Sequence, residues 1–124
     1  MTMETTFAAK ATENIRAAES LFELEMFNAS SNRAYYAALH AAVAVLGKAG
    51  IQFDRMDHEK VQANFNSELI RRKKVYPSRL RSYLLDLQAV RNVADYSSRG
   101  VSKKAAERQL NRAREFVKAL QQET

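Results

Sequence analysis

The sequence predicts an all-α protein, an up-and-down bundle of four to five helices. Apolar residues recur at steps of three and four along almost the whole chain, and no segment alternates with the period of two that strands require. The 124 residues include only 3 Gly and 1 Pro, too few for the frequent turns of a β-sandwich or barrel. A chain of this length builds one core, so we expect residues 1–124 to form a single domain. The periodic segments predict helices over about 5–27, 31–49, 58–73, 77–96 and 103–122.

The first predicted helix keeps its apolar residues on one face. Asn28 is expected to end it, because Asn tolerates the left-handed conformation found after helix ends. Ser30 or Ser31 is then expected to cap the second helix. The apolar face consists of Phe7, Ala11, Ile15, Ala18, Phe22 and Met26.

The second predicted helix is apolar on all sides. Between Ala34 and Leu46 only His40 is strongly polar, which indicates a helix that is buried on most of its surface. These 13 residues are too few for a membrane span, which needs roughly 20. We therefore expect this helix at the centre of the bundle and no membrane association. Gly50 is expected to end it.

The last three predicted helices have recognisable boundaries. Asp57 and Ser102 are suitable N-caps for the third and fifth helices. Pro77 separates the third helix from the fourth, because proline lacks a backbone donor and fits only the start of a helix.

Basic charge is concentrated in the second half of the chain. Residues 1–62 carry 6 basic and 8 acidic groups, net −2, whereas residues 63–124 carry 14 and 6, net +8. This asymmetry favours a polyanionic partner, most simply nucleic acid or a nucleotide. The densest basic residues are Arg71, Arg72, Lys73, Lys74, Arg79 and Arg81, which we call the basic patch. A solvated helix end that complements the helix dipole remains the alternative interpretation.

Polar residues interrupt two of the apolar faces. Arg91 lies on the apolar stripe of the fourth helix, and Asp95, four residues later, is its expected ion-pair partner. On the second helix, Arg33, Tyr36 and His40 share one stripe.

Two interpretations of these stripes stay open. The polar residues of both helices, together with Tyr96, could line one anion-binding site. The alternative is structural: an ion pair at the edge of the bundle and a hydrogen-bonded core histidine.

Several chemistries are excluded by what the sequence lacks. With no Cys and two His, a zinc site is not expected. The sequence also has no Gly-rich phosphate loop and no Gly-x-Ser-x-Gly nucleophile motif. We expect no metal and no cofactor. The lack of Cys fits a reducing compartment, so a cytoplasmic protein is expected.

Particular segments resemble the small stand-alone HEPN-domain proteins associated with toxin–antitoxin modules. They are SSNRAYYAALHAAVA at 30–44, His58-Glu59, RNVADY at 91–96, VSKKAAE at 101–107 and FVKAL at 116–120. The resemblance covers nearly the whole chain. It implies a helical homodimer that acts with a minimal nucleotidyltransferase partner in a toxin–antitoxin or defence module.

The resemblance also implies which residues act. Catalytic members are metal-independent ribonucleases with an Arg, often a following polar residue, and a His four to six residues after the Arg. Arg91 and Asn92 match the first two, but Tyr96 stands where His is expected, with Asp95 before it. A tyrosine with a pKa near 10 is a poor general base.

We therefore expect a protein that binds RNA or a nucleotide. Arg91 would hold phosphate, and Asn92 would orient Arg91 or form a hydrogen bond with the ligand. Tyr96 would stack on the ligand or be modified by the partner. The ligand-binding set is Arg91, Asn92, Asp95, Tyr96, Arg33, Tyr36 and His40. One alternative is an active metal-independent endoribonuclease that uses Arg91 with Tyr96 or His40. Another is a non-catalytic oligomerisation or interaction module.

Overall fold

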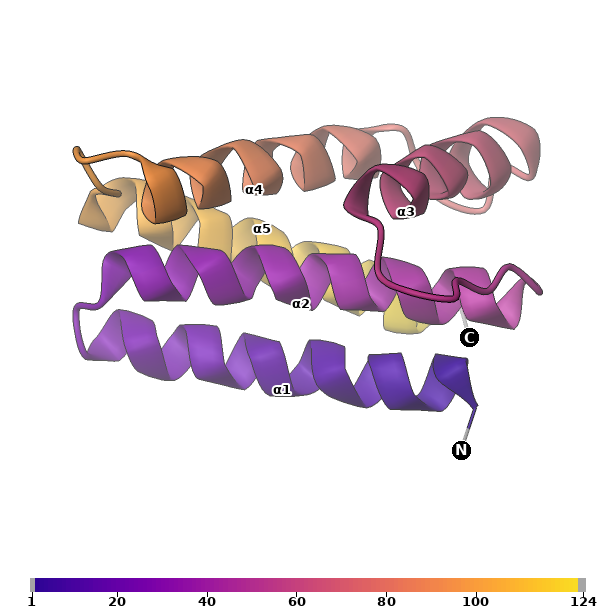
Figure 1. Cartoon of the computed structure of the whole chain (residues 1–124), viewed down its shortest axis with the longest axis horizontal. Helices are drawn as coiled ribbons and strands as arrows, with labels where there is room; N and C mark the ends of the chain where they lie inside the picture. Colours follow the sequence, from indigo (N-terminus) through magenta and orange to yellow (C-terminus); the bar gives the residue numbers. More distant parts are fainter. Residues whose placement is uncertain (1, 123–124) are drawn as a thin grey trace.

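A computed structural model describes residues 2–122 of the chain, and the prediction of an all-α bundle is confirmed. Within this range there are helices and no strand. The elements are α1 (Met3–Glu23), α2 (Phe27–Lys48), α3 (His58–Asn64), the π-helical segment η1 (Phe65–Arg72), α4 (Arg79–Tyr96) and α5 (Lys103–Gln122). Successive long helices run in opposite directions (Figure 1).

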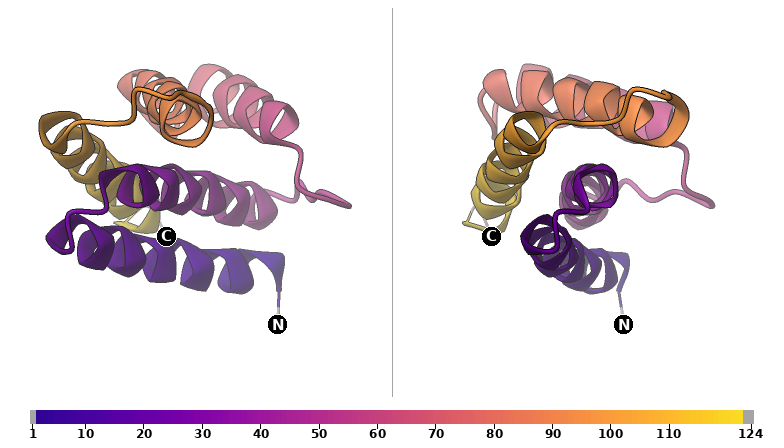
Figure 2. Two further views of the ribbon diagram at one scale, coloured as in Figure 1. Left: turned by 60° about the vertical axis from the view of Figure 1, so that its left-hand side comes forward. Right: turned by 90° about the vertical axis from the view of Figure 1, so that its left-hand side faces the viewer.

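Helix α2 lies at the centre of the bundle. It packs against α1, α4 and α5, and Figure 2 shows α1 on one side of it and α4 on the opposite side. Its buried residues run almost without interruption from Ala34 to Leu46, as the apolar sequence predicts. Since the same chain covers this helix, its hydrophobicity does not itself require a second copy.

The turn between α1 and α2 differs from the sequence prediction. Helix α1 ends at Glu23, and Glu25 adopts a left-handed φ of 61° to make the turn. Asn28, expected to end the first helix, lies inside α2 instead. Its side-chain oxygen accepts a hydrogen bond from the Val101 N–H at 2.8 Å. The residue thus ties the start of α2 to the loop before α5, a role that only the tertiary structure defines.

The expected serine caps of the second helix are also wrong. Ser30 and Ser31 are fully buried within α2. The Ser30 hydroxyl donates to the Ala18 carbonyl of α1 at 2.8 Å, so it serves helix packing rather than capping.

The other boundary signals act as predicted. Asp57 accepts a hydrogen bond from the Lys60 N–H at 3.2 Å, and Ser102 accepts one from the Ala105 N–H at 3.1 Å. Gly50 follows α2 with a left-handed φ of 89°. Helix α4 begins at Arg79, two residues later than predicted.

The second half of the predicted third helix is the π-helical segment η1. The Lys73 N–H donates to the carbonyl of Glu68, five residues earlier, at 3.0 Å. The wider turn lets Phe65, Leu69 and Ile70 all face the core. The residues that follow, Arg71 to Val75, are exposed.

Candidate functional site

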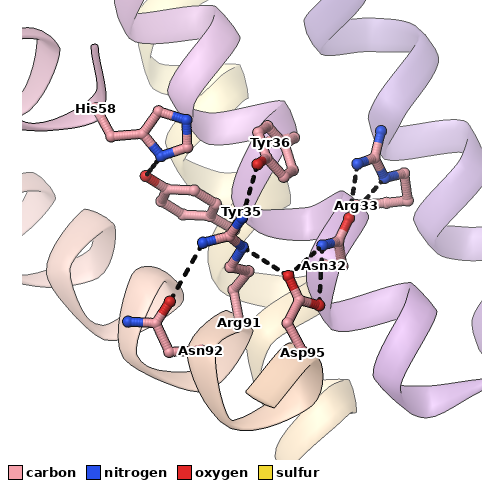
Figure 3. Close-up of polar contacts among 8 residues, drawn as sticks. All are labelled: Asn32, Arg33, Tyr35, Tyr36, His58, Arg91, Asn92 and Asp95. Atoms are coloured by element: carbon pink, nitrogen blue, oxygen red, sulfur yellow. Dashed lines mark hydrogen bonds and ion pairs between the residues drawn. The ribbon is translucent and has the colours of Figure 1, made fainter. Parts of the chain in front are cut away.

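Polar and aromatic side chains from four helices meet around Tyr36, between α2 and α4. We call this group the Tyr36 cluster. Helical spacing on α2 places Arg33, Tyr36 and His40 on one side of the helix. Figure 3 shows its central members. The cluster comprises Asn14, Asn32, Arg33, Tyr35, Tyr36, His40, His58, Arg91, Asn92, Asp95 and Tyr96.

Two guanidinium groups contact the ring of Tyr36. The Cζ atom of Arg33 lies 4.7 Å from the ring centroid, and that of Arg91 lies 5.4 Å from it. Arg91 Nη2 also donates a hydrogen bond to the Tyr36 hydroxyl at 2.8 Å. The structure therefore brings together three of the residues singled out from the sequence, Arg33, Tyr36 and Arg91.

Asp95 and Asn32 connect the two guanidiniums. Asp95 Oδ2 lies 2.9 Å from Arg91 Nε, which is the ion pair expected from their spacing. The Asn32 amide nitrogen donates to both carboxylate oxygens of Asp95, at 3.1 and 3.0 Å. The Asn32 oxygen accepts from Arg33 Nε at 2.9 Å and Nη2 at 2.6 Å. A continuous path thus runs from Arg33 through Asn32 and Asp95 to Arg91 (Figure 3).

Arg33 is held by neutral groups. Besides the Asn32 oxygen, the side-chain oxygen of Asn14 accepts a hydrogen bond from Arg33 Nη1 at 3.0 Å. In the part of the chain that the structure describes, no carboxylate lies within 4.0 Å of the Arg33 guanidinium. The cluster therefore holds two permanent positive charges and the single negative charge of Asp95.

His40 is fixed in a neutral form. Its Nδ1 lies 3.1 Å from the amide nitrogen of Asn14, which also donates to the Lys10 carbonyl at 3.0 Å. Nδ1 is therefore an acceptor, and the ring proton is on Nε2. Burial, followed by the charges of Lys10 and Arg33, lowers the pKa of His40 to about 4.

His58 has a similar arrangement on the other side of Tyr36. The Tyr35 hydroxyl lies 3.0 Å from His58 Nδ1. Gln62 donates to that hydroxyl at 3.3 Å and to the side-chain oxygen of Gln88 at 2.9 Å. The Tyr35 hydroxyl and His58 Nδ1 thus share one hydrogen bond, in which either group can be the donor. Burial raises the pKa of Tyr35 to about 12, and burial with the charge of Arg91 lowers the pKa of His58.

Two predicted residues lie at the exposed edge of the cluster. Tyr96 is 76% exposed, and its ring centroid lies 5.7 Å from Arg91 Cζ. The side-chain oxygen of Asn92 accepts from Arg91 Nη1 at 3.3 Å. Both residues are therefore placed to meet a ligand that approaches Arg91 from solvent.

The basic patch lies outside the Tyr36 cluster. Arg79 begins α4 and Arg91 lies near its end, about 18 Å further along the helix axis at 1.5 Å per residue. Arg72 pairs with Glu68 at 3.3 Å, and all six residues of the patch are exposed.

Several residues of the cluster were not singled out from the sequence as candidates. Asn14 lies between Ala11 and Ala18 on the buried face of α1, so it is a polar residue on an apolar stripe. Asn32 lies four residues before Tyr36, on the same side of α2. At both positions the helical period of the sequence places a polar residue on the face of the helix that the cluster occupies. Gln62 and Gln88, which adjoin the cluster, carried no such signal, because the bonds of Gln62 to Tyr35 and to Gln88 exist only in the packed structure.

Comparison with known proteins bears on the whole chain. No described helix is long and apolar enough to cross a membrane. No curated protein matches the chain. Residues 6–123 match the family model described as HEPN domain.

Proposed function

Because the chain belongs to the HEPN domain family, we propose that it binds RNA or a nucleotide through the Tyr36 cluster and does not cleave it. The observation that supports this most strongly is the pair of guanidiniums, Arg33 and Arg91, on one tyrosine ring. Asp95 balances only one of the two charges. Guanidinium groups bind phosphate through planar sets of N–H donors, so the surplus positive charge suits a phosphate-bearing ligand.

Each residue at the edge of the cluster has a role in this proposal. Arg91 binds phosphate and Asn92 orients its guanidinium. Tyr96, an exposed ring beside Arg91, stacks on a base. A ligand that reaches both Arg91 and the basic patch must be a polymer, since a mononucleotide is shorter than the helix between them.

The proposal is tested by the affinity for a fluorescently labelled single-stranded RNA, measured by anisotropy at fixed salt. Arg91→Ala and Arg33→Ala should each weaken binding about tenfold, in line with the roughly 1.5 to 3 kcal/mol of a hydrogen bond to a charged group. A melting curve of each variant shows whether it is folded. Unchanged affinity in both folded variants would contradict the proposal.

The competing function is a metal-independent ribonuclease, which needs a general base close to Arg91. Nδ1 of His40 already accepts a hydrogen bond, Nδ1 of His58 is hydrogen-bonded to the Tyr35 hydroxyl, and Tyr96 occupies the position where the family pattern has histidine. We therefore expect little or no RNA cleavage by the wild type with chelator present. Tyr96→His should raise cleavage, since general acid–base help is worth roughly 100- to 10,000-fold, and a further Arg91→Ala change should remove the gain.

Robust metal-free cleavage by the wild type that Arg91→Ala abolishes would instead support the ribonuclease. Cleavage that ignores Arg91 would indicate a contaminating nuclease.

We also propose a homodimer that acts with a nucleotidyltransferase-like protein in a toxin–antitoxin or defence module. The resemblance of the chain to HEPN proteins is the support for this part. In such a pair, the exposed Tyr96 would be the site that the partner modifies. An oligomer that does not bind RNA would favour the alternative of a pure interaction module.

A further inference from the structure

Asp95 occupies a position that helix stability does not explain. It is the second-last residue of α4, where the helix dipole is negative and a carboxylate is unfavourable. Its partner Arg91 lies four residues before it, and this order of base and acid is the less favourable one for an intrahelical pair. The reason for a carboxylate here must therefore lie in the Tyr36 cluster.

The ion pair between Asp95 and Arg91 is also imperfect. The two atoms are 2.9 Å apart, but the buried Arg91 Nε–H makes no well-aligned hydrogen bond. The other two nitrogens of Arg91 donate to neutral oxygens, those of Tyr36 and Asn92. Asp95 is thus the one anionic partner of Arg91 among the described residues, and it leaves the Nε donor poorly satisfied.

Asp95 is the more exposed member of this ion pair. Its side chain is 25% exposed, against 15% for Arg91, and it lies in the last turn of α4. Its other contact is the amide of Asn32, a neutral donor. If the Asp95 side chain rotated into solvent, its contacts with Asn32 and Arg91 would be lost, but the Arg91 guanidinium would still be held by the Tyr36 hydroxyl.

We propose that Asp95 is an internal competitor for the ligand: its carboxylate occupies the place on Arg91 that a ligand phosphate takes. This inference rests on the proposed function. Two anions on one guanidinium repel each other, so a phosphate that binds Arg91 displaces Asp95. An oxygen of the bound phosphate then accepts a well-aligned hydrogen bond from the Arg91 Nε–H.

This competition selects a chemical class of ligand. A terminal phosphate carries a charge of about −1.5 to −2 at pH 7, whereas an internal phosphodiester carries one charge. The doubly charged group displaces a carboxylate more readily. The ligand class assigned to the site is therefore RNA or a nucleotide with a terminal phosphate.

The test measures the affinities of wild type and Asp95→Asn for one RNA sequence prepared with a 5′-phosphate or a 5′-hydroxyl. Asparagine keeps the shape of the side chain and removes its charge. We expect Asp95→Asn to bind the 5′-hydroxyl RNA about tenfold more tightly than the wild type does, and to lose most of the preference for the 5′-phosphate.

A matched control is Asp86→Asn, which removes a carboxylate from the same helix. Asp86 pairs with Arg112 and accepts from Gln109, away from the Tyr36 cluster. The control should leave the 5′-phosphate preference unchanged. An equal gain in both variants would reduce the effect to net charge and overturn the proposal.

A second variant guards against misfolding. Asp95→Ala should also bind more tightly and melt close to the wild type. Unfolding of both Asp95 variants would assign Asp95 a structural role and overturn the inference. If Arg91→Ala weakens RNA binding but Asp95→Asn gains no affinity, Asp95 is not a competitor for the ligand, and the proposed function still stands. An RNA affinity that Arg91→Ala leaves unchanged would contradict the proposed function itself.

Discussion

At the scale of residues, the Tyr36 cluster owes its properties to the side-chain amides that separate its charges. Asn14 and Asn32 each accept from Arg33, and each turns its own amide nitrogen to another group, His40 or Asp95. A carboxylate at either amide position would neutralise the surplus positive charge. The amides satisfy the donors of a half-buried guanidinium without cancelling its attraction for an anion.

The neutral state of His40 predicts how stability depends on pH. The folded pKa of about 4 lies below the ordinary value of 6.5, so the unfolded chain binds more protons between these values. The contribution of His40 to the free energy of unfolding should therefore be constant above about pH 7 and fall as the pH drops from 6.5 towards 4. At this half-buried group the loss is about 1 to 2 kcal/mol after allowance for solvent screening.

Urea unfolding between pH 7.5 and 4.5 measures this loss. The charged groups that act on His40 are Lys10, Arg33 and His58, and all three lower its pKa. A His40→Asn variant is the control, because it removes the titrating ring and should show a smaller loss. Equal pH dependence in the two proteins would show that His40 is not the group responsible.

At the scale of elements, the basic patch spans the end of η1, the loop after it and the start of α4. The π-helical segment ends at Arg72, and Lys74 then takes a left-handed φ of 54°, so the chain leaves the helix with its basic side chains in solvent. The patch and the Tyr36 cluster lie at opposite ends of α4. They should therefore contribute to RNA binding in different ways.

Replacement of Arg71, Arg72, Lys73 and Lys74 by Ala should weaken RNA binding alike for all sequences. Each lost phosphate contact should reduce the slope of log affinity against log salt by about 0.7, the value for single strands. This slope is obtained from RNA affinities measured at salt concentrations between about 50 and 200 mM. An unchanged slope would assign the run to a solvated surface.

The elements also show which features were predictable from the sequence. The caps at Asp57 and Ser102 and the Arg91–Asp95 pair are local, and they were predicted correctly because their partners lie within four residues. Asn28 was misread because its hydrogen bond goes to Val101, a residue far along the chain. Local signals cannot show such a partner.

The widening of the third helix into η1 was not predicted either. Its apolar residues at Phe65 and Leu69 fit an α-helix, so their spacing did not indicate the wider turn in which Ile70 is also buried. The network of Tyr35, His58 and Gln62 likewise depends on how α3 packs on α2. The fold followed from periodicity, whereas much of the cluster depended on tertiary packing.

At the scale of the whole molecule, the monomer already covers its central helix with α1, α4 and α5. A second copy must therefore bind through the outer surface, where Leu85 and Tyr96 of α4 are large exposed apolar residues, 44% and 76% exposed. We expect a dimer, with twice the chain mass of 14.1 kDa in light scattering at micromolar concentration. A mass equal to a single chain would contradict this part of the proposal.

The central claim is that the guanidinium of Arg91 binds the phosphate of an RNA or nucleotide. The most direct measurement compares the RNA affinities of Arg91→Ala and Arg114→Ala. Arg114 also pairs with a carboxylate, that of Glu19 at 2.7 Å, but on the side of the bundle formed by α1 and α5. Both variants lose one charge. We predict about a tenfold loss of affinity for Arg91→Ala and little change for Arg114→Ala; equal effects of the two variants would contradict the account.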